Sequence, residues 1–187
     1  MRDFELLVFI GRFQPFHLGH LSVVEYALER SNHLLILCGE GPLSFNIYGP
    51  SFTKKLIVES LTSEQKERVQ ISFIKDVCDL GSSRYSDPRP DNNKWVESVL
   101  QRVDEAFFNY RNQKIGLIGH QKDDSSYYLD LFPDWESVRS PNFKSLNATD
   151  IRERIDQSGL NYLLSDEADN HMTQATISLL IDFYRNR

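Results

Sequence analysis

Residues 11–20, with the sequence GRFQPFHLGH, constrain the fold of this chain more than any other segment. The apolar run at 6–10 that precedes them is typical of a buried strand, and apolar residues recur at helical spacing over 21–28. The segment therefore predicts a corner between a strand and a helix. At such a corner the first backbone N–H groups of the helix and the positive end of its dipole face outward and favour an anion.

Three residues of this corner are candidates for holding phosphate. Gly19 lets an anion approach the backbone, and His17 and His20 are spaced to aim their rings to the same side of the first helical turn. Two histidines could also be half of a zinc site, which needs about four ligands. Because Cys38 and Cys78 stand far apart and no Cys-x-x-Cys occurs, the pattern favours a phosphate over a metal.

Residues 11–20 resemble the His-x-Gly-His signature of the nucleotidylyltransferase superfamily, in the form found in nicotinamide mononucleotide adenylyltransferases of the archaeal type. Bacterial relatives carry the same domain, often fused to a Nudix hydrolase. The second signature of the superfamily, a Ser/Thr-x-x-Ile-Arg helix start, is similar to Asn147–Arg152, where Asn147 replaces the usual Ser and keeps a capping side chain. Two motifs in this order are more specific than either alone.

Two segments between the signatures resemble the same family, so that the resemblance covers residues 5 to about 157. Asp76, and Asn92 three residues before Trp95, resemble the segment that holds the nicotinamide. Residues 118–135 are similar to the Gly-His-x-Lys-Asp and Phe-Pro-x-Trp segment of the Nudix-fused members.

The chain departs from the family pattern after Ser44. The family usually places an Arg there that is thought to touch the triphosphate, whereas this chain has Tyr48, followed by Lys54 and Lys55. The role of that Arg is therefore either lost or passed to one of these lysines.

The resemblance implies adenylyl transfer, in which the 5'-phosphate of nicotinamide mononucleotide (NMN) attacks the α-phosphorus of ATP, pyrophosphate leaves and NAD forms. Because the nucleophile is already an anion, the site has only to align two polyanions and stabilise the charge on the leaving group. The residues expected to do so are His17, His20, Arg12 and Arg152, with the histidines as donors to the ATP phosphates and the arginines as fixed positive forks.

The binding residues that the resemblance implies fall into three groups. Those expected to bind ATP are Gly11, Phe13, Gln14, Gly19, Gly119, Asn147 and Thr149. Those expected to bind the nicotinamide nucleotide are Asp76, Asn92 and Trp95, with Trp95 either stacking on the ring or packing in the core. His120, Lys122 and Asp123 are further candidates. Mg²⁺ is expected to arrive with ATP, held mostly by phosphate oxygens and water, so we expect no metal ligands in the protein itself.

Length and composition agree with one globular nucleotidylyltransferase domain over residues 1–187, with a C-terminal helical segment from about residue 160. The formal net charge of −6 argues against nucleic-acid binding, so an anionic substrate must meet a local cluster of positive charge. No stretch reaches the roughly 18 apolar residues that a membrane span needs. Two single cysteines fit a reducing compartment, and we expect a cytoplasmic protein. Whether it forms a homo-oligomer stays open.

The fold class that the pattern predicts is α/β, a Rossmann-like, doubly wound parallel sheet of about five strands with helices on both faces. Strands are expected at 5–10, 33–38, 69–74, 114–118 and 135–138, and helices at 18–30, 53–61, 92–108, 148–155 and 172–184. The signatures and the segments after Ile74 and Ile118 all follow strands, so they are expected to meet at one cleft. Residues 77–92 read as a long loop that is either a solvated linker or a cover over the nucleotide.

Three functions are compatible with these observations. The first is NMN adenylyltransferase in NAD biosynthesis. The second is an adenylyltransferase for another small phosphate, such as phosphopantetheine or a flavin nucleotide, and the third is a nucleotide-sensing module without turnover. Because Gly-x-Gly-x-x-Gly and the P-loop pattern do not occur, a dehydrogenase or a P-loop kinase is disfavoured.

Overall fold

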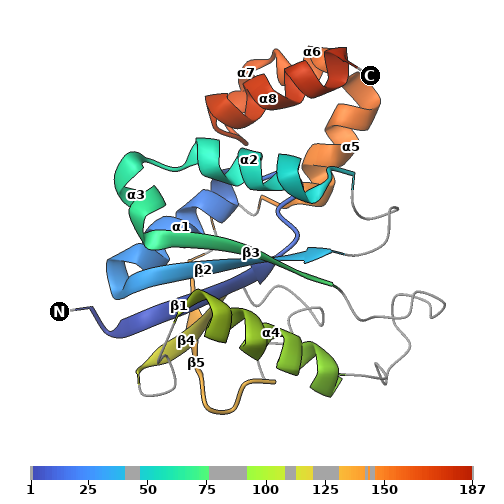
Figure 1. Ribbon diagram of the computed structural model, residues 1–187. Coiled ribbons are helices and arrows are strands. Elements are labelled where there is room, and N and C mark those ends of the chain that lie inside the picture. Colours follow the sequence, from blue (N-terminus) through green and yellow to red (C-terminus); the bar gives the residue numbers. More distant parts are fainter. Residues whose placement is uncertain are drawn as a thin grey trace.

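A five-stranded parallel sheet forms the centre of the molecule. The computed structural model describes residues 2–40, 47–75, 92–107, 113–119, 131–141, 143 and 146–186. Its strands are β1 (Phe4–Gly11), β2 (Ser31–Glu40), β3 (Val69–Lys75), β4 (Ile115–Gly119) and β5 (Glu136–Arg139). They lie in the order β3-β2-β1-β4-β5, and every neighbouring pair is parallel (Figure 1). The predicted fold class is confirmed.

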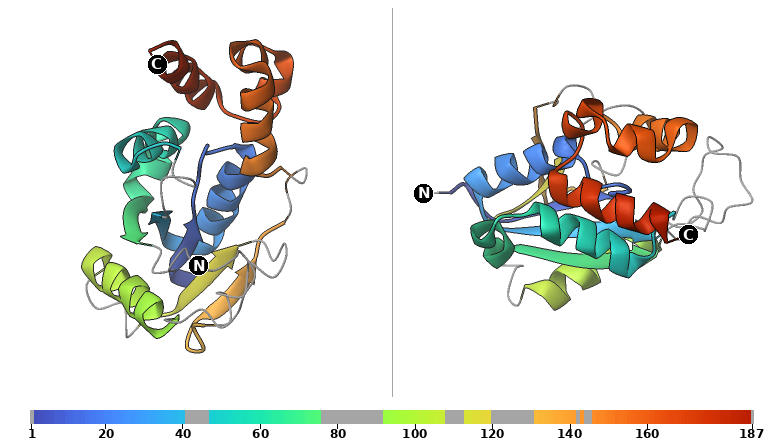
Figure 2. Two further views of the ribbon diagram at one scale, coloured as in Figure 1. Left: turned by 90° about the vertical axis from the view of Figure 1, so that its right-hand side faces the viewer. Right: turned by 90° about the horizontal axis from the view of Figure 1, so that it is seen from above.

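Helices cover both faces of this sheet and extend beyond one of them. They are α1 (Leu18–Arg30), α2 (Pro50–Ser60), α3 (Ser63–Arg68), α4 (Asn92–Ala106), α5 (Ala148–Ser158), α6 (Leu160–Leu163), α7 (Asp166–Asp169) and α8 (Gln174–Arg185). Helix α4 covers one face, and α1 and α2 cover the other (Figures 1 and 2). The C-terminal helices stack on the outer side of α2, with α8 packed along it.

Alternating side chains of the central strand β1 enter two separate cores. Leu7 and Phe9 pack with α1, α2 and the C-terminal helices, while Leu6, Val8 and Ile10 pack with α4. Since successive side chains of a strand point to opposite faces, a strand that is apolar throughout must be covered twice. This explains why the run before the corner carries no polar residue.

Helix α3 was not expected from the sequence, and the helical segment expected from about residue 160 is divided into the short helices α6 and α7 and the longer α8. Helix α3 begins with a capping box, in which Gln65 N donates to Thr62 Oγ1 and Thr62 N donates to Gln65 Oε1, so its signal is present in the sequence. Helices α6 and α7 are single turns in the segment before α8. Helix α2 begins earlier than expected, with Pro50 in its first turn, a position that suits proline. None of the helices in the described ranges is long and apolar enough to cross a membrane.

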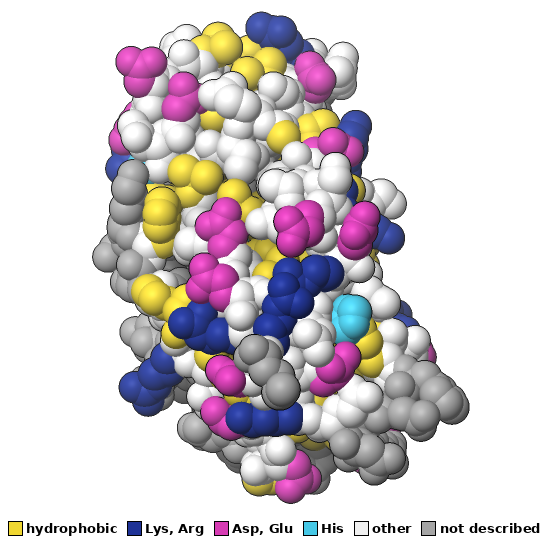
Figure 3. Space-filling view, turned by 90° about the vertical axis from the view of Figure 1, so that its left-hand side faces the viewer, with side chains coloured by type: hydrophobic (Ala, Val, Ile, Leu, Met, Phe, Trp, Pro, Cys, Tyr) yellow, Lys and Arg dark blue, Asp and Glu magenta, His cyan; other side chains and the backbone are white. Residues whose placement is uncertain are grey.

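The strand order reverses between β1 and β4. Both strands end at the same edge, because Phe9 pairs with Ile118 in the parallel register. Ligands of doubly wound sheets bind in the crevice beyond the carboxyl ends of the strands at such a reversal. At the opposite edge, where the strands begin, acidic and basic side chains are interspersed on the surface (Figure 3).

Candidate active site

His17 is the N-terminal cap of helix α1, and its ring forms a reciprocal capping box with His20. The backbone of His17 is extended, the His20 N–H donates to His17 Nδ1 at 3.3 Å, and the His17 N–H donates to His20 Nδ1 at 3.3 Å. Each Nδ1 must therefore be an acceptor, so a neutral ring carries its proton on Nε2. The capping box leaves both histidines as Nε2–H donors at the start of the helix.

The two imidazoles are stacked and held by aromatic neighbours. Their centroids lie 3.6 Å apart at an interplanar angle of 25°, which confirms that they face the same side of the first turn. The rings of Phe13 and Phe16 lie 5.0 Å and 5.5 Å from that of His20. His17 is only 3% exposed and His20 is half-buried. This packing fixes the direction of both Nε2 atoms.

The ring of His17 leaves no room for a side chain at Gly19. A Cβ on Gly19 would lie 2.9 Å from His17 Cε1 and 3.0 Å from His17 Nδ1, closer than side chains approach. The sequence suggested that this glycine admits a phosphate, whereas the structure gives it a role inside the corner. Two of the first backbone donors of α1 are also used internally, because the Leu18 N–H donates to the His171 carbonyl at 2.9 Å and the His20 N–H to His17. The expectation that these N–H groups face outward is wrong for those two.

The corner itself is strained at Phe13. Its φ is 57°, in the left-handed region that residues other than glycine rarely adopt. Its ring is 1% exposed and would contact a Cβ on Gly11 at 3.0 Å. Strain of this kind persists only where the surroundings enforce it, and it concentrates at functional sites. The side chain of Phe13 thus belongs to the core, so a contact with ATP would have to come from its backbone.

The second signature begins helix α5 beside this corner. Asn147 caps the helix by accepting from the Asp150 N–H at 2.9 Å, which is the capping role expected from the sequence. Arg152 reaches back across the site, where its Nη1 donates to the Gln14 carbonyl at 2.6 Å and its Nη2 donates to Thr149 Oγ1 at 3.0 Å. The structure therefore brings the two signatures together.

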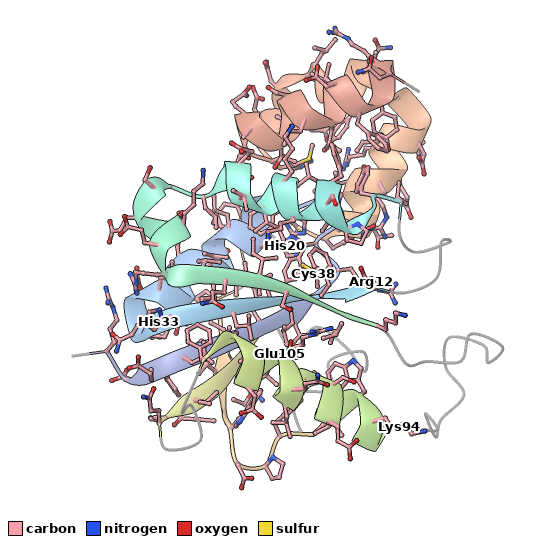
Figure 4. The ribbon with its side chains drawn as sticks, viewed as in Figure 1. Arg12, His20, His33, Cys38, Lys94 and Glu105 are labelled. Atoms are coloured by element: carbon pink, nitrogen blue, oxygen red, sulfur yellow. The ribbon has the colours of Figure 1, made fainter. Side chains whose placement is uncertain are left out.

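The positive charge of Arg152 is not neutralised by an ion pair within the part of the chain that the structure describes. Both of its hydrogen bonds go to neutral oxygens. Burial lowers the pKa of Arg152 and the charge of Arg12 lowers it further, whereas the charges of Tyr48, Asp156 and Glu153 raise it. Figure 4 places Arg12 and His20 at the edge of the sheet where β1 ends, and His33 at the opposite edge. Arg12 and Arg152 thus bring positive charge to this corner in a chain of net charge −6, which favours an anion there.

Gln14 and Tyr48 are buried parts of the same corner. Gln14 is 4% exposed, and its Oε1 accepts from the Ile47 N–H at 3.0 Å and the Tyr48 N–H at 3.4 Å. Tyr48 is 1% exposed, and burial, together with a hydrogen bond to Tyr184, raises the pKa of its phenol. The Gln14 side chain thus has a structural role, because it joins the corner to the backbone just before α2.

The remaining described candidates lie on other elements, namely β4, α4 and α2. Gly119 ends β4 at the reversal point and is buried there. Trp95, in the first turns of α4, is half-buried with its ring 6.0 Å from that of Phe132, so it packs against the second core. Lys54 and Lys55 are exposed on α2, and Lys55 lines a groove beside α8. Outside the described residues lie Asp76, the side chain of Asn92, His120, Lys122 and Asp123.

Sequence reasoning missed His171, Tyr162 and Tyr184. The His171 carbonyl caps α1, and the ring of His171 is held through Nδ1 by the Tyr162 hydroxyl at 2.8 Å. Tyr184 meets the hydroxyl of Tyr48 at 3.3 Å. No local pattern marks these contacts, because the partners lie in different segments: His171 is in the turn before α8, and Tyr48 precedes α2. The buried Cys38 is no candidate nucleophile, because burial and the charge of Glu40 raise the pKa of its thiol.

The fold and this paired-histidine corner define a nucleotidylyltransferase. Residues 8–75 match the family model described as cytidylyltransferase-like. A protein of Acinetobacter baylyi named nicotinamide/nicotinic acid mononucleotide adenylyltransferase is 41% identical over 157 residues, which are 82% of this chain and 76% of that relative. The chain belongs to the nicotinamide mononucleotide adenylyltransferase family.

Further matches agree with this family, and each covers only part of the other protein. The nicotinamide-nucleotide adenylyltransferase of Saccharolobus solfataricus is 41% identical over 92 residues, 48% of each chain. The crystal structure of a bifunctional NMN adenylyltransferase/ADP ribose pyrophosphatase from Francisella tularensis superposes with a TM-score of 0.72 at 28% identity. That match covers 98% of this chain and 52% of the other, so the chain spans about half the length of the bifunctional protein.

Proposed function

We propose that this protein transfers the adenylyl group of ATP to the 5'-phosphate of NMN, which gives NAD and pyrophosphate. The observation that carries the proposal is the stacked His17–His20 pair, whose Nε2 donors stand at the start of α1 in the same corner as Arg12 and as the Gln14 carbonyl that holds Arg152. Donors and cations of this kind suit a triphosphate. The family membership supports the same reaction.

In this reaction a phosphate oxygen of NMN forms a bond to the α-phosphorus of ATP while the bond from that phosphorus to the bridging oxygen of pyrophosphate breaks. No proton has to leave the nucleophile, so the residues act by alignment and charge stabilisation. The Nε2–H groups of His17 and His20 donate to the phosphates as negative charge moves onto pyrophosphate. Arg152, oriented by Gln14 and Thr149, provides a fixed positive fork.

A divalent metal fits this site as a companion of ATP. Among the described residues no group of three or more side chains could hold a metal ion, and the corner is lined by cations and imidazoles. We propose that phosphate oxygens and water are the ligands of Mg²⁺, which would neutralise part of the triphosphate charge when bound. A related bifunctional structure was solved with AMP and a manganese ion.

For the nicotinamide end, we propose the segment with Asp76, Asn92 and Trp95. The ring of Trp95 packs against Phe132, and the half-buried Trp95 keeps part of its surface exposed at the start of α4. Asp76 would repel the carboxylate of the acid mononucleotide and accept from the neutral carboxamide. We therefore expect the amide to be preferred by about tenfold in kcat/KM, a difference of roughly 1.4 kcal/mol.

The test is a coupled assay in which alcohol dehydrogenase reduces the NAD formed from ATP, Mg²⁺ and NMN. The acid mononucleotide is compared under the same conditions by chromatography of the product. NAD formation with a preference for NMN is the expected result. Turnover only with phosphopantetheine or a flavin nucleotide, or nucleotide binding without turnover, would overturn the proposed reaction. Equal efficiency of the two mononucleotides would show that Asp76 points away from the ring.

A further inference from the structure

The C-terminal helix α8 is tied to the phosphate site through one pair of phenols. Tyr48 stands just before α2 and is 1% exposed, and its hydroxyl lies 3.3 Å from that of Tyr184 near the end of α8. The Tyr48 ring also meets Phe183 of α8 edge-on, at a centroid distance of 5.2 Å. The buried hydroxyl of Tyr48 thus finds its partner in a helix 136 residues further along the chain.

Helix α8 is held against α2 at its other end as well. Ser60 Oγ, in the last turn of α2, lies 2.9 Å from Thr173 Oγ1 and 3.0 Å from Thr176 Oγ1. Thr173 is the N-terminal cap of α8. Helix α8 is thus docked at two separate places, by Ser60 at its start and by Tyr48 near its end.

Tyr48 is joined to Arg152 through Gln14. The side-chain oxygen of Gln14 accepts from the Tyr48 N–H, and its backbone carbonyl accepts from Arg152 Nη1 at 2.6 Å. The Tyr48 hydroxyl and the Arg152 charge also lie close enough to influence each other's pKa. A displacement of Tyr48 would therefore move the residue that holds the Arg152 guanidinium.

We propose that Tyr48, held by Tyr184, is a positioning residue for Arg152, so that the C-terminal helix takes part in binding the ATP phosphates. This inference rests on the proposed function, in which Arg152 binds the triphosphate. Since Tyr48 is neutral and buried, it acts through Arg152 and does not itself supply the charge. Where the family usually has an Arg that is thought to touch the triphosphate, this chain thereby has a buried tyrosine that supports Arg152.

The experiment compares Tyr184→Phe and Tyr48→Phe, which each remove one hydroxyl and keep the ring packing. We expect each variant to raise the KM for ATP about fivefold, as the loss of one hydrogen bond would, with the KM for NMN unchanged. The double variant should be no worse than either single one, because both changes remove the same bond. Titration of Mg·ATP by calorimetry without NMN should show the same fivefold loss of affinity.

The matched control is Ser60→Ala, which removes a hydroxyl that docks the opposite end of α8. It should lower the melting temperature without changing the KM for ATP. Equal rises in both KM values, additive effects of the two tyrosine changes, or the same KM change in Ser60→Ala would overturn the inference. If the parent binds Mg·ATP but forms no NAD, the proposed function fails, while the calorimetric comparison still decides the role of Tyr48.

Discussion

Replacing Gly19 by alanine should disable the histidine pair without unfolding the protein. The new Cβ would lie 2.9 Å from His17 Cε1. Carbon atoms in contact normally stand about 3.5–4.0 Å apart, so the ring has to retreat by about 0.6 Å. It has little room, because it is 3% exposed and stacked 3.6 Å from the ring of His20. A misplacement of about 1 Å can cost about a hundredfold in rate, so we expect kcat to fall by about ten- to hundredfold.

Stability should change much less than turnover in this variant. Alanine is favoured over glycine in a helix by up to about 1 kcal/mol. The weakened capping bond of His17 costs a similar amount, about 1 kcal/mol. We therefore expect a nearly unchanged free energy of unfolding, measured by urea denaturation alongside initial rates at saturating ATP and NMN. The control is Gly49→Ala, since a Cβ on Gly49 meets nothing within 4 Å. A kcat of Gly19→Ala within twofold of the parent would refute the reasoning.

Three further perturbations test other parts of the account. His20→Ala should lower kcat by roughly a hundredfold or more, the loss of one oxyanion-type donor, and a kcat within threefold of the parent would remove it from catalysis. If Lys54 or Lys55 supplies the charge missing at Tyr48, its change to alanine should raise the KM for ATP and spare the KM for NMN, whereas parent-like kinetics in both variants would place that charge elsewhere. Burial raises the pKa of Tyr162 from 10.0 to about 12, and burial with a hydrogen bond to Tyr184 raises that of Tyr48 further. The unfolded chain therefore releases these protons first, so the free energy of unfolding should hold below pH 10 and fall as pH rises toward 12, by up to about 1.4 kcal/mol per pH unit for each phenol. Urea denaturation from pH 8 to 11 checks this, and an equally steep fall in Tyr48→Phe would contradict it.

Much of the fold could be predicted because its signals are local. The strand and helix periods around residues 11–20, the apolar run of β1 and the capping side chain of Asn147 each act within a few residues. The reversal of strand order then brings the two signatures to one edge of the sheet. The sequence also contained the capping box of α3 at Thr62 and Gln65, which periodicity alone does not reveal in so short a helix.

The parts that could not be predicted depend on distant partners. The reason for Gly19 is visible only once the His17 ring is known to fold back as a cap. Tyr48 looked like a lost basic residue, whereas its burial against Tyr184 depends on how α8 packs on α2. Long-range packing of this kind leaves no period in the sequence, so only the fold reveals which side chains serve the site and which support it.

The fate of the α-phosphorus of ATP tests the central claim most directly. The protein is incubated with Mg²⁺, NMN and ATP that carries ³²P in its α-phosphate, and the products are separated by chromatography. Adenylyl transfer predicts that all released label enters NAD, with one pyrophosphate formed for each NAD. Label that appears in ADP or AMP without dinucleotide, or that stays in ATP, would contradict the assignment of the histidine corner as an adenylyltransferase site.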